Sequence, residues 1–356
     1  MGNTIVKLWN GEIKGLSKWV IYIPLFLLVL IYKGIISLRE WAYTKRIIKT
    51  VETGIYVISV GNITLGGTGK TSVVERLSFL LKEKGMRPGI ITRGYKRRKK
   101  GTFCVDIKKD KAIDVGDEAF MLAKKTRVPV LVSDKKYEAV RLGIKDFGID
   151  VAILDDAFQT KNIKKDLEIV IIKGGSINNC YCLFPLGPYR EPLTALKRAD
   201  IVLTNKDSHD MCQDFFIQGI PRYGIKYKPA YLYNIKHHMI GHYNVIRGNN
   251  VLAFSGLGDN HSFYNMIESL GGNLIDKISF PDHYKYREKD IKALSKIQGV
   301  DFIITTEKDA VKLMDLHIPE NLFYLGVNLE IEKENEFMDN IISRIDEFKR
   351  FRVYKH

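Results

Sequence analysis

The chain has 356 residues, of which 45% are hydrophobic, and a formal net charge of +15 at pH 7. This length accommodates about two domains, and the apolar content excludes an intrinsically disordered chain. The charge favours anionic partners, which include phosphorylated substrates, anionic lipid and nucleic acid, and does not by itself choose among them. The four cysteines show no C-x-x-C spacing, which argues against a zinc knuckle or a disulfide framework.

An apolar run near the N-terminus extends from Trp19 to Tyr32, and the apolar pattern resumes after Lys33. Its length approaches the ~20 residues that cross a bilayer. No small-residue cleavage site follows, so a membrane-spanning helix, and after it a helix lying in the interface, is favoured over a cleaved signal peptide. Lysine and arginine are more frequent after the run than before it, which predicts that the large C-terminal part stays cytoplasmic.

Beyond this anchor (residues 1–50), short apolar segments alternate with helical patterns, which predicts an α/β P-loop domain with a mostly parallel sheet over residues 51–228. Residues 229–248 are rich in Tyr, His and Lys, break this rhythm and are interpreted as an interdomain connection. A second, smaller α/β domain is expected over residues 249–356. The expected strands are 56–60, 88–92, 128–132, 151–154, 169–172, 201–204, 251–254 and 302–305, with second-domain helices near 262–270 and 287–296.

A glycine-rich stretch follows the expected strand 56–60 and precedes a helical pattern over residues 72–84. Closely spaced glycines let backbone N–H groups converge on a phosphate, a lysine reaches the β- and γ-phosphates, and a threonine hydroxyl ligates Mg²⁺. Thr64 occupies the first glycine position of the strict Walker A pattern. The alternative is a glycine-rich turn that only joins a strand to a helix. The stretch reads Gly66-Gly67-Thr68-Gly69-Lys70-Thr71.

The expected strand 151–154 ends in Asp155 and Asp156. An apolar parallel strand that delivers a carboxylate beside a phosphate-binding loop is typical of a Walker B motif, and Mg²⁺ prefers such oxygen ligands. Adjacent residues point in different directions, so the pattern does not decide which carboxylate meets the metal. The alternative is a strand that ends in a polar turn.

Three further groups carry candidate polar side chains. Asp117 and Glu118 precede a helical pattern at 119–124, where simple N-capping is the alternative role. Asp282 and His283 lie in a loop of the expected second domain, and an Asp-His pair is more often structural than catalytic. Arg190 stands in a proline-rich loop, where it either binds a phosphate or serves only the turn.

Together these segments resemble tetraacyldisaccharide 4'-kinase, the lipid A 4'-kinase family of Gram-negative bacteria. The resemblance covers nearly the whole chain, including the N-terminal apolar run, and Thr64 fits the family's pattern. The shared motifs are Gly61-Asn62-Ile63-Thr64, Gly66 to Thr71, Arg93-Gly94-Tyr95, Gly116-Asp117-Glu118, Asp155-Asp156-x-Phe158-Gln159, Gly187-Pro188-x-Arg190-Glu191-Pro192, Phe254-Ser255-Gly256, Asp282-His283 and Thr306-Glu307-Lys308-Asp309.

The resemblance implies an enzyme of the inner membrane, with its catalytic domains on the cytoplasmic side. It would move the γ-phosphate of ATP to the 4'-hydroxyl of a tetraacylated glucosamine disaccharide 1-phosphate and so form lipid IVA. The resemblance also implies two domains that face each other across a cleft, and ATP and Mg²⁺ as cofactors. The implied partners are the lipid substrate and the membrane, without nucleic acid and without an obligatory protein partner.

The same resemblance implies roles for individual residues. Asp117 and His283 match a carboxylate–histidine pair that assists proton removal from the sugar hydroxyl, and Lys70 is a catalytic cation. The implied metal ligands are Thr71, Asp155, Asp156 and Glu118. Arg190 and Asp282 match positions that bind substrate or phosphate. The implied nucleotide-binding residues are Thr64, Gly66, Gly67, Thr68, Gly69, Lys70 and Thr71.

Two residues depart from the family pattern: Ala157 and Thr160 stand where the family usually has glycine and histidine. Alanine restricts the backbone where glycine was free, and threonine removes an imidazole. Two other function classes remain open from the residues alone. A membrane-tethered P-loop NTPase that recruits a partner does not account for Asp282 and His283. A nucleic-acid-binding NTPase would require an aromatic–basic stacking motif, which the sequence lacks.

Overall fold

The computed structural model describes residues 8–9, 13, 15–172, 182–205, 217–258 and 260–353. Cys180 and Cys212, two of the four cysteines, lie outside these ranges. The chain divides into two compact units. Unit 1 comprises residues 1–92, 135–226 and 331–356, and unit 2 comprises residues 93–134 and 227–330.

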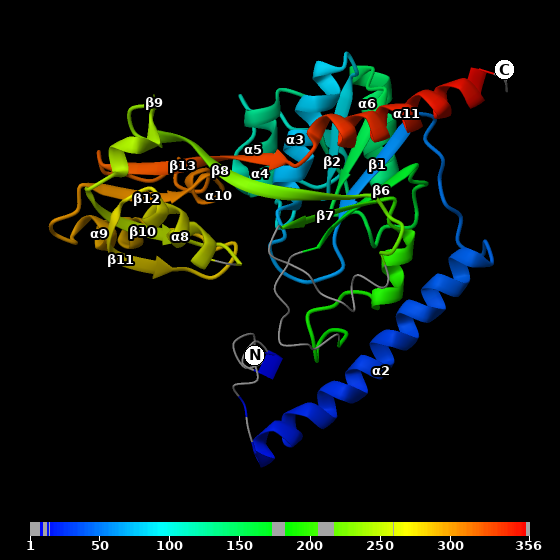
Figure 1. Ribbon diagram of the computed structural model, residues 1–356, viewed down its shortest axis with the longest axis horizontal. Coiled ribbons are helices and arrows are strands. Elements are labelled where there is room, and N and C mark those ends of the chain that lie inside the picture. The colour runs from blue at the N-terminus through cyan, green and yellow to red at the C-terminus, as the bar shows by residue number, and fades with distance from the viewer. Residues whose placement is uncertain are drawn as a thin grey trace. The chain divides into compact units, whose positions relative to one another are not determined.

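Unit 1 is built on a parallel sheet (Figure 1). Its strands lie in the order β8-β7-β6-β1-β5-β2, and every pairing between neighbours is parallel. The strands are β1 (Tyr56–Gly61), β2 (Pro88–Thr92), β5 (Val151–Asp155), β6 (Leu167–Ile172), β7 (Ile201–Asn205) and β8 (Arg222–Asn234), the last of which continues into unit 2.

Strands β1, β2 and β5 are buried along their whole length. A strand covered on both faces reads as a continuous aliphatic run, which is why these strands could be located from the sequence to within one residue. The register places Tyr56 beside Val151 and Val60 beside Asp155. The carboxyl ends of β1 and β5 therefore meet at one edge of the sheet. The predicted α/β class with a mostly parallel sheet is confirmed.

Four α-helices and one 3-10 helix of the described residues complete unit 1. Helix α3 packs over β1, β5 and β2 and buries an apolar stripe that includes Val73 and Leu77. Helix α11 returns the C-terminal segment to this unit, where Phe348 meets Tyr56 edge-on with ring centroids 5.3 Å apart. The sequence did not predict α6 or α11. The helices are α2 (Leu16–Thr44), α3 (Lys70–Glu83), α6 (Lys136–Phe147), the 3-10 helix η1 (Leu193–Arg198) and α11 (Glu334–Val353).

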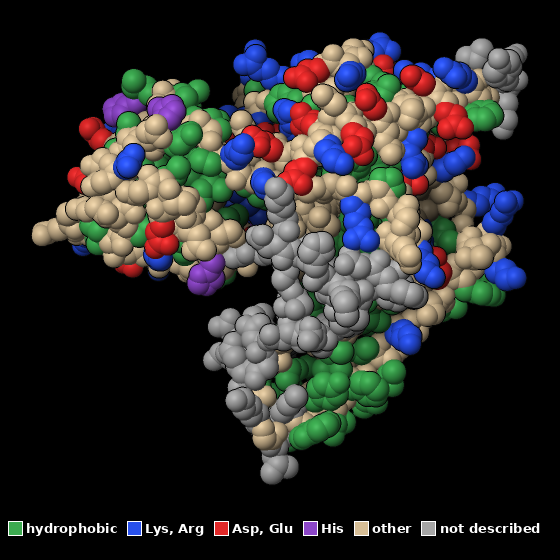
Figure 2. Space-filling view, in the orientation of Figure 1, with side chains coloured by type: hydrophobic (Ala, Val, Ile, Leu, Met, Phe, Trp, Pro, Cys, Tyr) green, Lys and Arg blue, Asp and Glu red, His purple; other side chains and the backbone are tan. Residues whose placement is uncertain are grey.

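Helix α2 presents an uncovered apolar surface. Its segment Trp19–Thr44 is long and apolar enough to cross a membrane by length and composition. Figure 2 shows hydrophobic side chains gathered over this helix. An apolar surface of this extent on one element is typical of a membrane or partner contact. The exposed side chains are Trp19, Val20, Ile23, Phe26, Leu27, Leu28, Leu30, Ile31, Ile35, Leu38 and Trp41.

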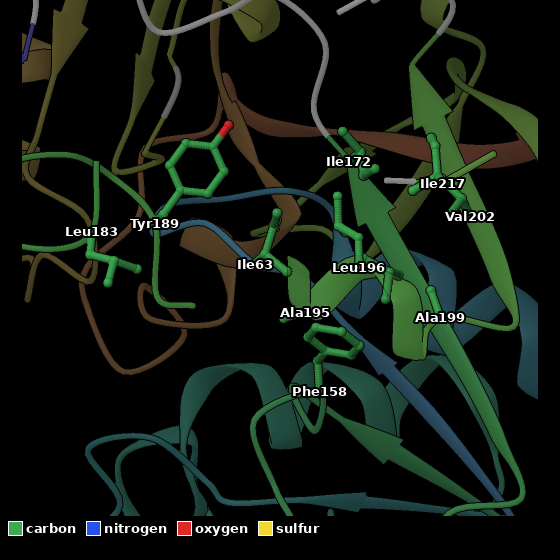
Figure 3. Packing of buried hydrophobic residues seen from close by; sticks show 11 residues of the cluster. Ile63, Phe158, Ile172, Leu183, Tyr189, Ala195, Leu196, Ala199, Val202 and Ile217 are labelled. Atoms are coloured by element: carbon green, nitrogen blue, oxygen red, sulfur yellow. The ribbon is translucent and has the colours of Figure 1, made fainter. Parts of the chain in front are cut away.

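A hydrophobic cluster lies at the carboxyl edge of the unit 1 sheet (Figure 3). Ile63 enters it from the segment after β1, and Phe158 from the segment after β5. Val29 and Tyr32 of α2 pack against it, so the cluster supports both the loops that leave the sheet and the N-terminal helix. Its other members are Val170, Ile172, Leu183, Tyr189, Ala195, Leu196, Ala199, Val202 and Ile217.

Unit 2 contains four parallel strands in the order β11-β10-β12-β13, namely β10 (Asn250–Ser255), β11 (Asn273–Ser279), β12 (Phe302–Thr306) and β13 (Leu322–Ile331). Two antiparallel pairs join β9 (Met239–Gly241) to β8 and β3 (Phe103–Cys104) to β4 (Val130–Val132). Its helices are α4 (Ala112–Val115), α5 (Asp117–Thr126), α8 (His261–Ser269), α9 (Glu288–Ser295), α10 (Glu307–Ala310) and the 3-10 helix η2 (Tyr243–Ile246).

The compact units differ from the expected domains at two places. Residues 93–134, expected in the P-loop domain, group with residues 227–330 because α5 packs against α10. Residues 331–356, expected in the C-terminal domain, group with unit 1, where α11 packs. The expected connection 229–248 is largely regular structure, since it contains the end of β8, all of β9 and η2.

Gly61 ends β1 in close contact with Phe158. A Cβ at residue 61 would lie 2.6 Å from the Phe158 Cβ. We expect Gly61→Ala to lower the free energy of unfolding by about 1–3 kcal/mol, because overpacking forces the surroundings to shift. Chemical denaturation in detergent measures this. Gly34→Ala is the control, since its Cβ would meet no atom within 4 Å, and equal effects of the two substitutions would contradict the packing argument.

Candidate functional site

The phosphate-binding loop connects β1 to α3, as the sequence predicted. Gly66 and Gly69 have φ angles of 103° and 81°, a region that glycine enters at little cost. Gly69 directly precedes α3, and the first turn of this helix contains Lys70 and Thr71. The predicted loop residues are therefore contiguous at the carboxyl end of β1. They are Thr64, Gly66, Gly67, Thr68, Gly69, Lys70 and Thr71.

The loop leaves room for an anion. A Cβ added at Gly66 or Gly67 would meet no atom within 4 Å. The Thr68 hydroxyl is buried and has no hydrogen-bond partner among the residues that the structure describes. The first N–H groups of a helix such as α3 have no partner within the helix and attract anions. Open space, an unsatisfied hydroxyl and a helix N-terminus together fit a phosphate group.

Lys70 is held beside this loop by two oxygen atoms. Its Nζ donates a hydrogen bond to Asn62 Oδ1 at 3.2 Å and lies 3.7 Å from Asp156 Oδ1. Gln159 Nε2 in turn donates to the Asn62 carbonyl oxygen at 2.8 Å. Asn62 and Gln159 therefore fix the ammonium group where a lysine of this motif reaches a bound phosphate.

Asp155 and Asp156 at the end of β5 have different surroundings. The Asp155 side chain is buried, and its Oδ2 accepts a hydrogen bond from the Thr92 hydroxyl at 3.2 Å. Asp156 is exposed, and its φ of 45° lies in the left-handed region, which turns the chain sharply at the end of the strand. This turn directs the Asp156 carboxylate toward Lys70.

One guanidinium nitrogen of Arg190 contacts both oxygens of the Asp156 carboxylate. This nitrogen, Nη1, lies 2.9 Å from Asp156 Oδ1 and 3.0 Å from Oδ2. Partial desolvation raises the pKa of Asp156, but the cations of Lys70 and Arg190 outweigh it and hold the pKa below its usual range. Asp156 is therefore ionised at neutral pH and shared between two cations.

Residues 184–192, here called the proline loop, carry Arg190 to this position. The Leu65 N–H donates to the Pro188 carbonyl oxygen at 2.7 Å, and the Arg190 N–H donates to the Ile63 carbonyl oxygen at 2.7 Å. These main-chain bonds tie the proline loop to the beginning of the phosphate-binding loop. The sequence alone did not predict this pairing, because the two loops lie more than a hundred residues apart in the chain.

Lys136 is a residue that sequence reasoning missed. It begins α6 and is buried, and its Nζ donates to the carbonyl oxygens of Asp155 and Asp156, the latter at 3.3 Å. The ammonium thus fixes the turn that orients Asp156. Its position could have been noticed in the sequence, because Lys136 follows the expected strand 128–132 by four residues. Residues at the carboxyl ends of strands in α/β proteins commonly bind ligands.

The oxygen donors of unit 1 fit a magnesium ion. Thr71, Asp155 and Asp156 supply a hydroxyl and carboxylates, which are the hard ligands that Mg²⁺ prefers. Among the described residues, no three His, Cys, Asp or Glu side chains converge into a metal cage. Mg²⁺ that is bound largely by substrate phosphates needs only one or two carboxylates. Glu118, the other predicted ligand, lies in unit 2.

Ala157 and Thr160, the two departures from the family pattern, fit the turn after β5. Ala157 is buried and does not have a positive φ, so alanine causes no backbone strain there. Its N–H donates to the Val60 carbonyl oxygen at 3.2 Å, and the Thr160 N–H donates to the Ala157 carbonyl oxygen at 2.9 Å. The side chain that replaces glycine leaves the turn intact.

In unit 2, Asp117 and Glu118 form the first turn of α5, as predicted. Gly116 precedes them with a φ of 99°, and a Cβ there would lie 3.0 Å from the Gly94 carbonyl carbon. The two glycines therefore bring two backbone segments into direct contact. This contact places Tyr95 near the start of α5.

His283 lies between two carboxylates of the same unit. Its Nδ1 is 3.6 Å from Asp117 Oδ2, and its Nε2 is 3.8 Å from Asp282 Oδ2. The Tyr95 ring lies against the imidazole with centroids 4.9 Å apart. Both nitrogen–oxygen distances exceed hydrogen-bond length, so the imidazole is placed between the carboxylates without being locked to either. The structure brings the predicted Asp117–His283 pair together.

Lys308 joins the remaining two predicted residues of unit 2. Its Nζ lies 3.0 Å from Glu118 Oε1 and 3.2 Å from Asp282 Oδ1. Burial lowers the pKa of Lys308, but the two carboxylates outweigh it and raise the pKa above its usual value. Glu118 and Asp282 are therefore both held by Lys308.

Asp309 explains two motifs that sequence analysis could not interpret. Its buried carboxylate accepts hydrogen bonds from the Gly256 N–H, the Thr306 hydroxyl and Lys312 Nζ, each at 2.8 Å. These bonds tie the end of β10 to the start of α10. Their role is structural, since they fix the helix turn that presents Lys308.

Comparisons with known proteins place nearly the whole chain among similar proteins. A family model described as tetraacyldisaccharide-1-P 4'-kinase matches residues 21–346. The tetraacyldisaccharide 4'-kinase of Aquifex aeolicus is 35% identical over 320 residues, covering 88% of this chain and 96% of that protein. The tetraacyldisaccharide 4'-kinase of Halothermothrix orenii is 34% identical over 351 residues, covering 89% and 90%.

One solved structure is similar over most of both chains. It is described as the "apo" form of LpxK from Aquifex aeolicus in complex with ATP. It superposes with a TM-score of 0.75 at 33% sequence identity, and the match covers 90% of this chain and 98% of that one. At this coverage the similarity extends to both compact units.

Lys70→Ala tests the phosphate-binding loop. Charge-assisted hydrogen bonds contribute about 1.5–3 kcal/mol, so we expect the affinity for ATP with Mg²⁺ to fall at least about 10-fold. Equilibrium binding to the purified chain in detergent measures this. Lys84→Ala is the matched control, because Lys84 is exposed at the far end of α3. Equal affinities of Lys70→Ala and wild type would place the nucleotide elsewhere.

Lys308→Met leaves Glu118 and Asp282 without their shared cation. Both are partly exposed, so we expect a loss of about 1–3 kcal/mol in stability, less than for a fully buried pair. Because the pKa of Lys308 is raised, its contribution is complete below the ordinary lysine value of about 10.5 and is lost only as pH rises through the raised value.

The difference in unfolding free energy between Lys308→Met and wild type should therefore be constant from about pH 7 to about pH 9. Denaturant titration at several pH values measures it, with Lys289→Met at an exposed position as the control. A difference that shrinks steadily over this range would show that Lys308 is already losing its proton.

Proposed function

Because the chain belongs to the tetraacyldisaccharide-1-P 4'-kinase family, we propose that it transfers the γ-phosphate of ATP to the 4'-hydroxyl of a tetraacylated glucosamine disaccharide 1-phosphate. The product would be lipid IVA, on the route to lipid A and lipopolysaccharide. The observation that carries the proposal is the family match over residues 21–346, supported by a phosphate-binding loop whose Lys70 lies beside Asp156.

The transfer forms a bond between the 4'-oxygen and the γ-phosphorus and breaks the bond from that phosphorus to the β–γ bridging oxygen of ATP, which leaves on ADP. The hydroxyl proton needs an acceptor. An ordinary aspartate is too weak to ionise an alcohol in advance, but a loose phosphoryl transfer requires the proton to leave only late. We assign this proton to Asp117, with His283 beside it as the partner that orients the carboxylate and shares the proton.

Unit 1 supplies the phosphate chemistry in this proposal. Lys70 and the N–H groups of the phosphate-binding loop hold the β- and γ-phosphates and stabilise charge in the transition state. We assign Mg²⁺, which would neutralise phosphate charge when bound, to Thr71 with Asp155 or Asp156. Glu118 would have to leave Lys308 before it could ligate the ion.

We further propose that α2 attaches the enzyme to the inner membrane from the cytoplasmic side. Among the described residues, α2 contacts the hydrophobic cluster of unit 1 from Val29 onward. The preceding part of the helix, residues 16–28, is about 20 Å long at 1.5 Å per residue, which is short of the hydrocarbon thickness of about 30 Å. The length of the whole apolar helix favoured a membrane-spanning helix. The shorter free part favours insertion into one leaflet of the bilayer instead.

The kinase assay follows labelled γ-phosphate from ATP to tetraacyldisaccharide 1-phosphate in detergent. We expect Asp117→Asn and His283→Gln to lower kcat by about 10²–10⁴-fold, the usual contribution of a positioned proton acceptor. The affinity for ATP should change little, since the loop around Lys70 is untouched. His317→Gln is the control, because His317 is an exposed histidine of the same unit.

The assay also separates the other function class. Phosphate that is released to water without labelled lipid would favour a membrane-tethered NTPase that recruits a partner. Labelled lipid produced at wild-type rates by both the Asp117 and the His283 variants would remove these residues from the mechanism and leave the kinase assignment standing.

A further inference from the structure

The N-terminal helix α2 reaches the proline loop through two polar contacts. The Tyr32 hydroxyl donates a hydrogen bond to the Arg190 carbonyl oxygen at 2.8 Å. About two turns further along the helix, Arg39 Nη2 donates to Glu191 Oε1 at 3.1 Å. The helix that carries the apolar surface thus contacts two consecutive residues near the end of the proline loop.

Glu191 is the buried centre of this contact. Its side chain is only 2% exposed, and it pairs with Arg39 from α2 on one oxygen and with Arg198 Nη2 from η1 at 2.5 Å on the other. A buried carboxylate without cations is strongly unfavourable. The carboxylate therefore holds α2 and η1 in one arrangement. A second ion pair, between Glu40 of α2 and Lys161, lies in the same region of unit 1.

Arg190 and Glu191 are consecutive, and their side chains serve different partners. The Arg190 guanidinium binds Asp156, whereas the Glu191 carboxylate binds α2. The peptide unit between them is planar and carries the Arg190 carbonyl oxygen that accepts from Tyr32. The Arg190 N–H, in the preceding peptide unit, donates to the Ile63 carbonyl oxygen at the start of the phosphate-binding loop. A displacement of α2 thus reaches the Asp156 carboxylate through one peptide unit and one side chain.

Hydrophobic contacts also join α2 to the proline loop, in addition to the polar contacts. Val29 and Tyr32 of α2 pack on the cluster that also contains Tyr189 of the proline loop and Ile63. An independent contact comes from the segment before α2, where Trp9 Nε1 donates to the Pro185 carbonyl oxygen at 2.9 Å. The proline loop is therefore held by N-terminal residues at both of its halves.

We propose that Tyr32, Arg39 and Glu191 are positioning residues that couple the position of α2 on unit 1 to the nucleotide site. They set the position of Arg190, and through it the Asp156 carboxylate that Lys70 faces. The same helix that meets the lipid surface thereby sets the affinity of the phosphate-binding loop for its nucleotide. This coupling goes beyond the proposed function, and its test reads nucleotide binding without any lipid acceptor, so either can fail alone.

The test is a double-mutant cycle on the full chain in detergent micelles. The single variants are Tyr32→Phe, Arg39→Gln and Arg190→Gln, and the double variants combine each α2 change with Arg190→Gln. Equilibrium binding of ATP with Mg²⁺ gives the affinity, and thermal unfolding checks that each variant is folded. Tyr43→Phe is the matched control, because Tyr43 lies on the same helix and donates no hydrogen bond to residues 184–192 within the part of the chain described.

Coupled residues show interaction effects of about threefold to a hundredfold. We expect Arg39→Gln to weaken ATP binding about threefold to tenfold, and Tyr32→Phe by a smaller factor. Once Arg190 is glutamine, neither α2 change should weaken binding further. Arg39→Lys, which keeps a cation for Glu191, should remain within about twofold of wild type, a rescue that a purely structural disturbance would not give.

Two results would overturn the proposal. In the first, Arg39→Gln and Tyr32→Phe remain folded and bind ATP as wild type does. In the second, their effects multiply with that of Arg190→Gln, which would mean that α2 and Arg190 act independently. If Arg39→Gln fails to fold, the Tyr32→Phe cycle decides the matter alone, since it removes only one oxygen atom.

Discussion

The arrangement around the predicted phosphate-binding loop depends on one carboxylate, that of Asp156, shared between Lys70 and Arg190. These three residues come from the turn after β5, the start of α3 and the proline loop. An ionised carboxylate draws both cations to one point at the edge of the sheet, and the cations in turn keep it ionised. The cations are thus already in place before a phosphate binds. A bound phosphate would compete with Asp156 for Lys70. Because Lys70 already lies beside the loop, the loop would need little reorganisation to receive the phosphate.

Unit 2 uses the opposite arrangement. There one cation, Lys308, lies between two carboxylates, Glu118 and Asp282, while His283 lies between Asp282 and Asp117. Lys308 neutralises two carboxylates of unit 2 that would otherwise repel each other. Asp117 is left with an imidazole rather than an ammonium as its neighbour.

The proline loop links these electrostatics to the apolar helix α2. Its backbone bonds to the phosphate-binding loop, its arginine holds Asp156, and its glutamate holds α2. A kinase whose acceptor is a lipid must work at a surface. If α2 inserts into that surface as proposed, its direct bonds to unit 1 would give this unit a defined orientation to the surface. A flexible tether would supply proximity but not orientation.

Local sequence patterns were enough to predict the α/β class, the phosphate-binding loop, the strand that leads into Asp155 and Asp156, the helix start at Asp117 and the apolar N-terminal helix. Each is a local pattern whose meaning depends on neighbours within one or two elements. Only the tertiary structure decided that residues 93–134 group with 227–330, that Lys136 fixes the turn at Asp156, that Lys308 pairs with Glu118, and that Glu191 joins α2 to the proline loop. These contacts join residues far apart in the chain, and a charged side chain carries no local mark of which distant opposite charge will neutralise it when both are buried.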